Sequence, residues 1–481
     1  MRIFALLLLA LCAPAWATVW YVRPVEAEYG AEDGTSYAAA FDGFADVNTA
    51  GLVSGDTVII CGTFDADSID SANLMMSVAA SGITWDGDCS GSGDLADAVI
   101  DGTGVNRGFD SGGSGSTGIT IQHMALSNFA QAAVMSQGTD TTDRDWIIND
   151  VTITLSGANP GGSIDNRGGG LTIQNSTITY CTDDCIYTEG VDLVLKDSTI
   201  SYPSQATATG DGLALVDQAT TFLVSNVAFT TAVDAKQCVL VQDNPGTIGG
   251  TVIGSECFGP SIAATLHSAF FFEGTGTVNF FSNYAENSQY LAYAANGATL
   301  IAAGNVGHTL SDHGIQCGTS ATTCVIVNNT IKDVPICYST GSASGTNAIQ
   351  NNIGSGCSTV GVRKNAGDTE NHNNIDDSLD VVDNDGVTTT PGTGTITTDP
   401  QFVVADPDVS AEFKLQGSSP ARDAGIAVGH YPDLRGTWAY RITPTIGAWE
   451  FGSGDPVGAR TAGTTLTTAT TRTGAATRAA R

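Results

Sequence analysis

A short motif returns every 22 to 29 residues through the middle of this chain, and it constrains the fold more than any other feature. Each copy reads apolar, any residue, polar turn residue, any residue, small residue or Thr, apolar. The clearest copies are Ile121–Leu126, Ile148–Ile153, Ile173–Ile178, Leu195–Ile200, Val224–Phe229 and Ile253–Phe258, and looser copies centre on Asn283, Asn305 and Asn328. A period in this range indicates one structural unit stacked on copies of itself.

The local pattern predicts that the repeated unit is built from strands. Apolar residues alternate with polar ones or form short runs rich in β-branched and aromatic residues, and Gly, Asn, Asp and Ser separate the runs. A β coil of this length stacked on itself is a parallel β-helix, with successive coils ~4.8 Å apart. The polar turn residues are then expected to stack as an Asn/Asp ladder. A large β-sandwich with coincidental spacing is the alternative.

The charge balance limits the classes of partner. The 481 residues include 50 acidic and 18 basic residues, which gives a net charge of −32. This argues against nucleic acid, because phosphate binding needs a basic surface. It also argues against unaided binding of a polyanionic glycan, which would need a bridging cation. Alternatively, the acidity only keeps the protein soluble.

The first 17 residues have the pattern of a secretory signal. Arg2 precedes an apolar run, Ile3–Ala13, and a small-residue cleavage pattern follows at Ala15–Ala17. The sequence therefore predicts a secreted protein, extracellular or at the cell surface, that begins at Thr18. Lipidation at Cys12 is a second interpretation of the same segment. No other stretch is apolar enough to span a membrane.

The cysteine count favours disulfides. Eleven cysteines are present, and ten remain if Cys12 leaves with the signal. An even number in an exported chain indicates disulfides, whereas no CxxC pair or His/Cys cluster supports a metal site. Because coil stacking brings sequence neighbours together, the expected pairs are Cys61–Cys89, Cys181–Cys185, Cys238–Cys257, Cys317–Cys324 and Cys337–Cys357.

Composition divides the mature chain into four parts. Residues 18–57 are expected to form an N-terminal strand and cap, in which Phe41–Leu52 forms a short helix over the open first coil. Residues 58–375 are expected to form the β-helix, and residues 376–451 a loop region and a β closing element. Residues 452–481 are rich in Thr, Ala, Gly and Arg and are expected to be disordered.

The segment 399–451 resembles a known family. It contains Asp399–Phe402, Ser418–Gly425 and Ile446–Phe451, which read DPQF, SSPARDAG and IGAWEF. These motifs are similar to the closing element of bacterial secreted proteins with right-handed parallel β-helix repeats, in the pectin-lyase-like superfamily. The resemblance implies an all-β, right-handed parallel β-helix. It specifies no activity, because one fold hosts many functions.

The best candidate site comes from aligning the coils on the turn. The alignment places Asp184 and Asp211 on adjacent coils, with Asp183 beside them, Lys236 one coil further and Arg167 on the coil before. Stacked carboxylates ~5 Å apart repel, which raises the pKa of one of them or recruits a cation. We therefore expect Asp183, Asp184, Asp211 and Lys236 to be catalytic and Asp184 and Asp211 to be calcium ligands. The chemistry is either acid–base glycoside hydrolysis or metal-assisted β-elimination of a uronate. An Asp that leads a turn into a strand is also ordinary in a β-helix.

One part of this cluster resembles polygalacturonase-type glycoside hydrolases. Thr182–Ile186 is similar to their Asp-Asp-Cys-Ile/Val strand, which implies catalytic roles for Asp183 and Asp184. That family also carries an upstream Asn-Thr-Asp, a downstream Gly-His-Gly and an Arg-Ile-Lys. Here Ser163–Asn166 and Gly210–Gly212 stand in the first two places, and Arg-Ile-Lys does not occur. These departures count against a hydrolase of that type.

Two further groups have both a functional and a structural interpretation. Eight aromatic residues are expected on adjacent coils, where they stack on sugar rings or fill the core: Phe270, Phe271, Phe272, Phe280, Phe281, Tyr284, Tyr290 and Tyr293. The segment Asp383–Gly386 resembles part of a calcium loop or is a polar turn. Together the sequence predicts action on extracellular polysaccharide, by binding or by lyase or hydrolase cleavage, with calcium as the expected cofactor. The alternative is a non-catalytic surface structural or adhesive solenoid.

Overall fold

The computed structural model describes residues 17–449, with gaps. The gaps are residues 26–29, 48–50, 72, 92–97, 114, 139–144, 155–161, 182, 191, 203–209, 217–220, 232–236, 243–246, 260–267, 319–322, 342, 344, 385–386, 405–406, 408–409, 430 and 434–443. The expected signal at 1–17, apart from Ala17, and the expected tail at 452–481 therefore lie outside the described residues. In the described part of the chain, no helix is long and apolar enough to cross a membrane.

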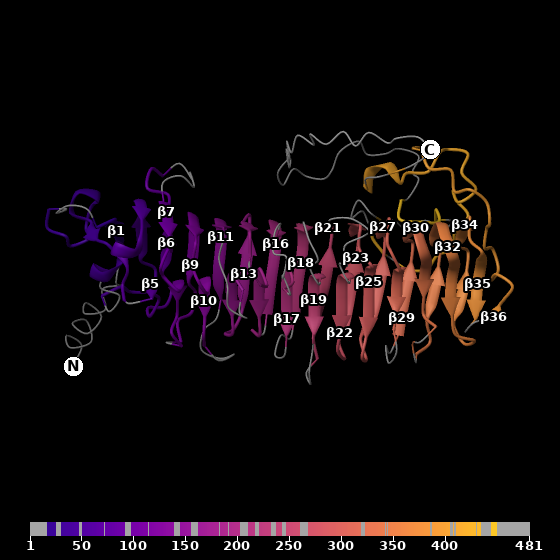
Figure 1. Cartoon of the computed structure of the whole chain (residues 1–481), viewed down its shortest axis with the longest axis horizontal. Coiled ribbons are helices and arrows are strands. Elements are labelled where there is room, and N and C mark those ends of the chain that lie inside the picture. The colour runs from indigo at the N-terminus through magenta and orange to yellow at the C-terminus, as the bar shows by residue number, and fades with distance from the viewer. Residues whose placement is uncertain are drawn as a thin grey trace, which may run out of the picture. The chain divides into compact units, whose positions relative to one another are not determined.

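The strands stack in chain order into three parallel sheets that wrap one core, so the expected parallel β-helix is confirmed (Figure 1). The first sheet contains β1 (Val19–Arg23), β3 (Thr57–Ile60), β6 (Thr84–Asp86), β9 (Thr120–Ser127), β11 (Trp146–Thr154), β13 (Leu171–Gln174), β16 (Asp192–Tyr202), β18 (Thr221–Thr231), β20 (Gly249–Ile253), β23 (Thr277–Phe281), β26 (Thr299–Ala303), β29 (Thr323–Val327), β31 (Ala348–Gln350) and β33 (Thr369–Asn371). The small β2 (Phe41–Asp42) pairs with β1.

The second sheet follows the first after a short turn. It contains β4 (Gly62–Phe64), β7 (Ala98–Asp101), the second halves of β9, β11, β16 and β18, β14 (Thr177–Thr179), β21 (Glu256–Phe258), β24 (Tyr284–Glu286), β27 (Val306–His308), the first halves of β30 (Thr330–Ser339) and β32 (Ile353–Lys364), and β34 (Asn374–Asp376). Several strands thus continue from the first sheet into the second, because a single residue with positive φ makes the turn between them.

The third sheet completes each coil. It contains β5 (Leu74–Ser77), β8 (Arg107–Asp110), β10 (Ala132–Ser136), β12 (Ile164–Asn166), β15 (Ile186–Thr188), β17 (Leu213–Val216), β19 (Gln237–Gln242), β22 (Ser268–Glu273), β25 (Tyr290–Ala295), β28 (His313–Cys317), the second halves of β30 and β32, and β35 (Asp380–Asn384). The antiparallel β36 (Val387–Thr388) follows β35. The parallel stack therefore continues beyond residue 375, where the sequence analysis places its end.

The turn between the first and second sheets contains two adjacent columns of residues. In the first column every residue has a positive φ, and its members are His123, Asp150, Asn175, Asp197, Asn226, Gly254, Ser282, Gly304, Asn328, Asn351 and His372. Left-handed backbone favours Gly, Asn and Asp, which accounts for the polar residue in the sequence motif. The second column is one residue further along and points inward.

A buried asparagine ladder occupies the second column in the C-terminal coils. Its members are Asn283, Asn305, Asn329, Asn352 and Asn373, each with a fully buried side chain. Each of the first four donates from its main-chain N–H and its Nδ2 to Oδ1 of the next, at 2.9–3.1 Å. The expected ladder exists, and the expected register holds at Ser255, Asn283 and Asn305; the N–H of Ser255 donates to Oδ1 of Asn283 at 3.0 Å. The motif positions from His123 to Asn226, and Asn328, belong to the positive-φ column instead.

The expected helix at Phe41–Leu52 is wrong. Phe41 and Asp42 form β2, and a 3-10 turn, η2, covers Phe44–Asp46. Gly43 between them has φ +78°, which ends any helical path, and Phe44 is fully buried in the core. The other 3-10 turns are η1 (Tyr37–Ala39), η3 (Ala66–Ser68) and η5 (Ser410–Glu412).

The C-terminal segment packs against the second sheet. A separate apolar cluster joins Phe402, Phe413, Leu415, Ala421, Ile446 and Ala448 to Tyr284, Val306 and Ile353 of that sheet. Ser282 donates its hydroxyl to the carbonyl of Asp433 at 2.6 Å, and Asn351 bonds the main chain of Ile426. This closing element therefore covers the positive-φ turns of several C-terminal coils.

Five disulfides lock the coils, and they are the pairs expected from coil stacking. Cys61–Cys89, Cys181–Cys185, Cys238–Cys257, Cys317–Cys324 and Cys337–Cys357 are bonded. The sequence separations run from 4 to 28 residues, so each bridge links residues of the same or the next coil.

Candidate functional site

The third sheet presents one continuous row of side chains away from the core. The inward row includes the core residues Phe109, Val134, Ile164 and Ile186, and side chains alternate along a strand, so their C-terminal neighbours point outward. Strand pairing aligns this outer row as Asp110, Met135, Asp165, Tyr187, Ala214, Leu240, Phe271, Tyr293, Gln316, Ser339, Arg363 and Asp383. The row runs across consecutive coils, and its partly exposed members make it a candidate surface for a linear ligand: Tyr187, Leu240, Phe271, Tyr293, Gln316 and Arg363.

The predicted aspartates lie where the third-sheet strands begin. Pairing of Ile186 with Leu213 places Asp184 and Asp211 on adjacent coils in one register, as the alignment predicts. The N–H of Asp211 donates to Oδ1 of Asp184 at 2.6 Å, and the N–H of Gln237 donates to Oδ1 of Asp211 at 2.8 Å. Asp211 is 4% exposed. One oxygen of each carboxylate is therefore committed to joining two coils.

The remaining members of that prediction are more distant or not described. Asp183 precedes Asp184 and is partly exposed, while Lys236 lies outside the described residues. Arg167 is on the coil before, but pairing of Asn166 with Thr188 places it toward the opposite end of the strand. The offset from Asp184 is five residues, or ~16 Å along the strand. The structure therefore separates Arg167 from the aspartates.

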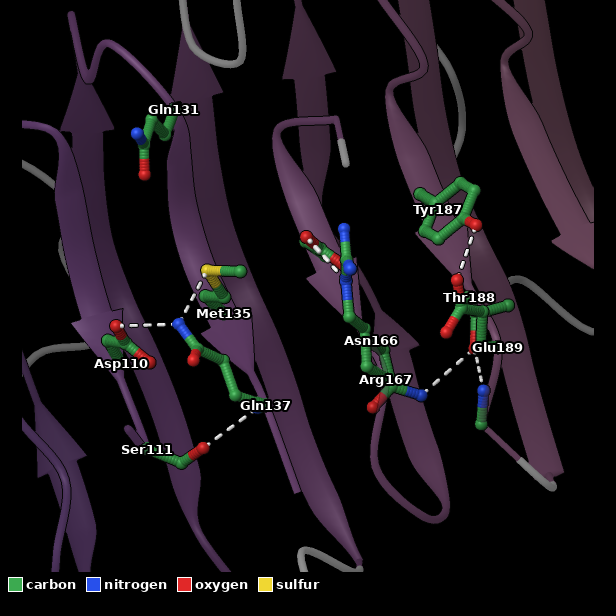
Figure 2. A network of polar contacts seen from close by, with 12 residues as sticks. Asp110, Ser111, Gln131, Met135, Gln137, Asn166, Arg167, Tyr187, Thr188 and Glu189 are labelled. Carbon is green, nitrogen blue, oxygen red and sulfur yellow. Dashed lines mark hydrogen bonds and ion pairs between the residues drawn. The ribbon is translucent and has the colours of Figure 1, made fainter. Parts of the chain in front are cut away.

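Arg167 belongs instead to a polar cluster on the outer face of β8, β10, β12 and β15, shown in Figure 2. Its Nε lies 3.0 and 3.2 Å from the two oxygens of Asp165, and its guanidinium lies 5.8 Å from the ring centre of Tyr187. The hydroxyl of Tyr187 donates to Glu189 at 2.6 Å. The side chain of Asp165 is 2% exposed and that of Arg167 is 40% exposed. A buried carboxylate thus holds a half-exposed guanidinium in place.

The same arrangement occurs two coils earlier. Arg107 donates to Asp110 at 2.8 Å and to Gln131 at 2.8 Å, and Gln137 donates to Asp110 at 3.1 Å. The side chain of Asp110 is 3% exposed and that of Arg107 is 33% exposed. We call Arg107, Asp110, Asp165, Arg167, Tyr187 and Glu189 the Arg–Asp cluster. Two guanidinium groups in an acidic protein are thereby fixed on one face, two coils apart.

Burial sets the electrostatics of this cluster. Burial raises the pKa of the Asp165 carboxyl, although the hydrogen bond and charge of Arg167 act in the opposite direction. The hydrogen bond to Asp165 raises the pKa of Arg167, so its guanidinium stays charged. The arrangement provides N–H donors and acidic acceptors side by side. Hydroxyl-rich ligands need such mixed donors and acceptors.

A third pair lies at the far end of the outer row. Nε of Arg363 lies 3.4 Å from Asp383, whose side chain is 9% exposed. The expected calcium-loop fragment at Asp383–Gly386 is only partly described, since 385 and 386 lie in a gap. Among the described residues, no group of three or more His, Cys, Asp or Glu side chains is arranged to hold a metal ion.

Sequence reasoning missed most of the Arg–Asp cluster. In the sequence, Asp165 stands out only within Ser163–Asn166, at the position of a family motif, and Arg107, Asp110, Tyr187 and Glu189 belong to no motif. A signal is present in the sequence, because Arg167 directly follows the strand that holds Asp165 and is two residues from it, the spacing at which side chains share a face when the chain stays extended.

Comparisons with known proteins add a likeness in fold. No family model and no curated protein match the chain. Among solved structures it is similar to pectate lyase Pel9A, with 13% identity, a TM-score of 0.49, and coverage of 91% of this chain and 98% of that one. It is also similar to a rhamnogalacturonan lyase, with 9% identity, a TM-score of 0.29, and coverage of 84% and 96%. At this similarity neither structure bears on the activity of the chain.

Proposed function

We propose that the protein is secreted and binds an extracellular polysaccharide along the outer face of the third sheet. The Arg–Asp cluster carries this proposal. Its guanidinium groups are held outward by buried carboxylates, so they are positioned before a ligand arrives and lose little freedom on binding. Coils repeat every ~4.8 Å, which offers a linear polymer similar groups at regular intervals.

The composition of the cluster supports a sugar ligand over other polymers. Guanidinium N–H groups donate to ring and hydroxyl oxygens, while Glu189 accepts from hydroxyls. Arg107 and Arg167 also supply local positive charge in a protein of net charge −32. A ligand with occasional acidic units is therefore tolerated at this face, although the whole surface disfavours a densely charged polyanion.

The finer proposal is cleavage of the bound chain. Asp183 and Asp184 would act as acid and base, Asp211 would tune the pKa of Asp184 from the next coil, and Lys236 would assist proton transfer. In the lyase form of this proposal, Asp184 and Asp211 would hold Ca²⁺, which would supply positive charge to neutralise the substrate acid.

A second candidate is a surface structural or adhesive solenoid without chemistry. One observation favours it: Oδ1 of Asp184 and Oδ1 of Asp211 each accept a main-chain N–H of the following coil. Carboxylates used in this way join coils as ladder residues do, and such a role needs no substrate.

Incubation of the mature protein with a glycan panel, with calcium or with chelator, separates these functions. New reducing ends without unsaturated products indicate a hydrolase. Reducing ends together with unsaturated products, both of which disappear when chelator is added, indicate a calcium-dependent lyase. Retention of a glycan without products indicates binding alone. If the folded protein neither retains nor alters any glycan, the polysaccharide proposal is wrong and the structural solenoid remains.

Variants then locate the function on the third sheet. Arg167→Gln removes the charge of one positioned guanidinium and is expected to weaken glycan retention about tenfold or more. Arg422→Gln, in the closing element and outside the third sheet, is the matched control and should bind as the parent does. If the finer proposal is right, Asp184→Asn abolishes cleavage but still retains the glycan. Full cleavage by both Asp184→Asn and Asp211→Asn would show that these aspartates are not catalytic.

A further inference from the structure

The outer row changes character three coils beyond Tyr187, where it becomes aromatic. Phe271 on β22 and Tyr293 on β25 are paired residues, and their rings stack with centres 5.2 Å apart and planes inclined by 29°. Tyr290, at the start of β25, lies 5.4 Å from Tyr293, ring centre to ring centre. All three rings are partly exposed. We call Phe271, Tyr290 and Tyr293 the aromatic row.

The other aromatic residues of this region pack in the core or against the closing element. Phe270, Phe272 and Phe280 are fully buried in the main core. Tyr284 packs in the cluster under the closing element, and Phe281 contacts Tyr431, with ring centres 6.1 Å apart. Alternation along β22 therefore separates core rings from outer ones. Only the aromatic row among the described members of this group lies on the outer face of the third sheet.

A glycine sets the orientation of Tyr293. A Cβ atom at Gly318 would come 2.3 Å from the hydroxyl oxygen of Tyr293 and 2.9 Å from its ring carbon Cε2. The ring therefore crosses the main chain at Gly318, in space that any other residue would fill. It lies along the sheet instead of standing away from it. A ring in this position presents a face, and the face of an aromatic ring is the part that stacks on a sugar.

Polar atoms lie beside these rings. The hydroxyl of Tyr290 donates to Asp312 at 2.7 Å, and the ring of Tyr290 stacks on His313 with centres 5.6 Å apart. Nδ1 of His313 lies 2.9 Å from Asp312, whereas its Nε2 is buried and has no hydrogen-bond partner. A buried side-chain oxygen normally accepts a hydrogen bond. Oε1 of Gln316, next to Tyr293 in the outer row, is buried and has no hydrogen-bond donor.

These unpaired atoms point to a missing polar ligand. The side chain of His313 is 8% exposed, and burial lowers its pKa, so the ring is neutral and able to donate or accept. Buried polar atoms without partners cost stability unless something pairs with them. Cross-strand stacking of the aromatic row explains its packing, but not the unpaired atoms beside it.

We propose that the aromatic row, with His313 and Gln316, is a binding site for an uncharged pyranose unit of the polysaccharide. The sugar stacks on Tyr293 and Phe271, and its hydroxyls reach His313, Gln316 and Asp312. Glu273, on the same strand as Phe271, and Asp312 are the flanking charges, so an acidic sugar is repelled here. The site extends the proposed function along the same outer face, ~14 Å from Tyr187.

Binding of neutral oligosaccharides to the full-length mature chain tests this site. Isothermal titration calorimetry measures the affinity of the protein for each oligosaccharide. The neutral series are xylo-, gluco-, manno- and galacto-oligosaccharides, and uronate oligosaccharides of matched length are the acidic series. We expect at least one neutral series to bind, with Tyr293→Ala and Phe271→Ala each weakening it about tenfold. Tyr293→Phe keeps the ring and should bind nearly as the parent does.

Two further variants separate binding from packing. Gly318→Ala keeps every aromatic residue but displaces the ring of Tyr293, so it should weaken binding as Tyr293→Ala does. Tyr37→Ala removes an aromatic that is 49% exposed outside the third sheet and should leave binding unchanged. Circular dichroism checks that each variant is folded.

The outcomes distinguish this inference from the function on which it rests. Equal binding by the parent and Tyr293→Ala would overturn the site. Binding of uronate oligosaccharides alone, lost in Arg167→Gln and kept in Tyr293→Ala, would keep the polysaccharide function and overturn the aromatic site. Failure of every oligosaccharide, neutral or acidic, to bind the folded parent would overturn both.

Discussion

The coils up to β18 and the coils from β24 onward make the same positive-φ turn with different residues around it. In the early coils the turn is at the surface, and its residues are His123, Asp150, Asn175, Asp197 and Asn226. In the later coils the closing element covers Ser282, Gly304 and Asn351, all of which are buried. The inward column beside the turn changes in parallel, from Met124, Val151, Ser176, Ser198 and Val227 to the asparagine ladder.

This difference shows how burial selects the polar group. A surface turn leaves its polar groups to water, so an aspartate or histidine is acceptable and a serine or valine suffices beneath it. A covered turn has no water, and each amide of the ladder supplies donors and an acceptor that neighbouring coils use. Asn305 accepts from Asn283 and donates to Asn329 and to the carbonyl of Phe280. The ladder is thus a requirement of the covered half.

The largest expected effect is loss of one ladder amide. Asn305→Ala removes the acceptor of the main-chain N–H of Asn283 and the side-chain donor to the carbonyl of Phe280, both in a fully buried region. Since each unpaired buried group costs about 1–3 kcal/mol, we expect a loss of about 3 kcal/mol or more in the free energy of unfolding. Chemical denaturation measures it. A loss below that of Ser198→Ala, in the same column of the early coils, would contradict the comparison.

A matched pair of glycines tests the covering itself. Gly304 has φ +69°, and a Cβ there would lie 2.4 Å from the carbonyl oxygen of Pro432 in the closing element. Gly254 has φ +62° but its nearest such neighbour, the N of Asn226, is 4.0 Å away. Gly254→Ala should cost about 1–2 kcal/mol for the left-handed backbone alone. Gly304→Ala should cost clearly more and release the closing element, seen as new proteolytic cleavage between residues 399 and 449.

A smaller effect is expected from the serines of the early coils. The hydroxyl of Ser176 accepts from the N–H of Val151 at 3.2 Å and donates to the carbonyl of Gln174 at 2.8 Å. Ser176→Ala should lower the free energy of unfolding by about 1 kcal/mol. Thermal unfolding of Ser176→Ala and of Asn305→Ala gives the ratio of their two losses of stability. Equal losses would mean that the two halves depend on the turn column to the same degree.

The smallest expected effect is a difference in acid sensitivity. Burial raises the pKa of Asp56, but hydrogen bonds from Val53, Thr18 and Trp20 outweigh it and hold the pKa below its usual value. A carboxyl with a lowered pKa stabilises the fold above its unfolded pKa and loses that contribution as pH falls through the folded one. The ladder amides do not titrate. Hydrogen exchange, corrected for intrinsic rates, should therefore show β1 and β3 losing protection between pH 5 and pH 2 before β26 and β29 do.

The comparison also explains what the sequence could predict. The spacing of the coils aligns Asp184 with Asp211, because both are two residues before a core residue that pairs with its neighbour. The ladder register is ambiguous at Asn283, since asparagine suits both the left-handed turn and the inward column. Only the structure shows that Ser282 holds the turn there.

The candidate site was harder to predict for a related reason. Coil alignment places Arg167 on the coil next to Asp184, but position along the strand decides which side chains meet. Arg167 directly follows the short strand that holds Asp165, and the buried aspartate pairs with its guanidinium. In a chain with 50 acidic residues, nothing in the sequence marks which of them are buried.

The local disulfides have a mechanical consequence. Every bridge links residues at most 28 positions apart, so none ties one end of the solenoid to the other. A force applied to the two ends would separate coils from one another, and each bridge would reduce the length of chain released by the loop that it closes. Cys61–Cys89 prevents extension of a loop of about one coil, whereas the loop closed by Cys181–Cys185 is only 4 residues in sequence separation. The covalent network therefore limits how far this molecule extends under load, but leaves the sequence of rupture to the hydrogen bonds between neighbouring coils.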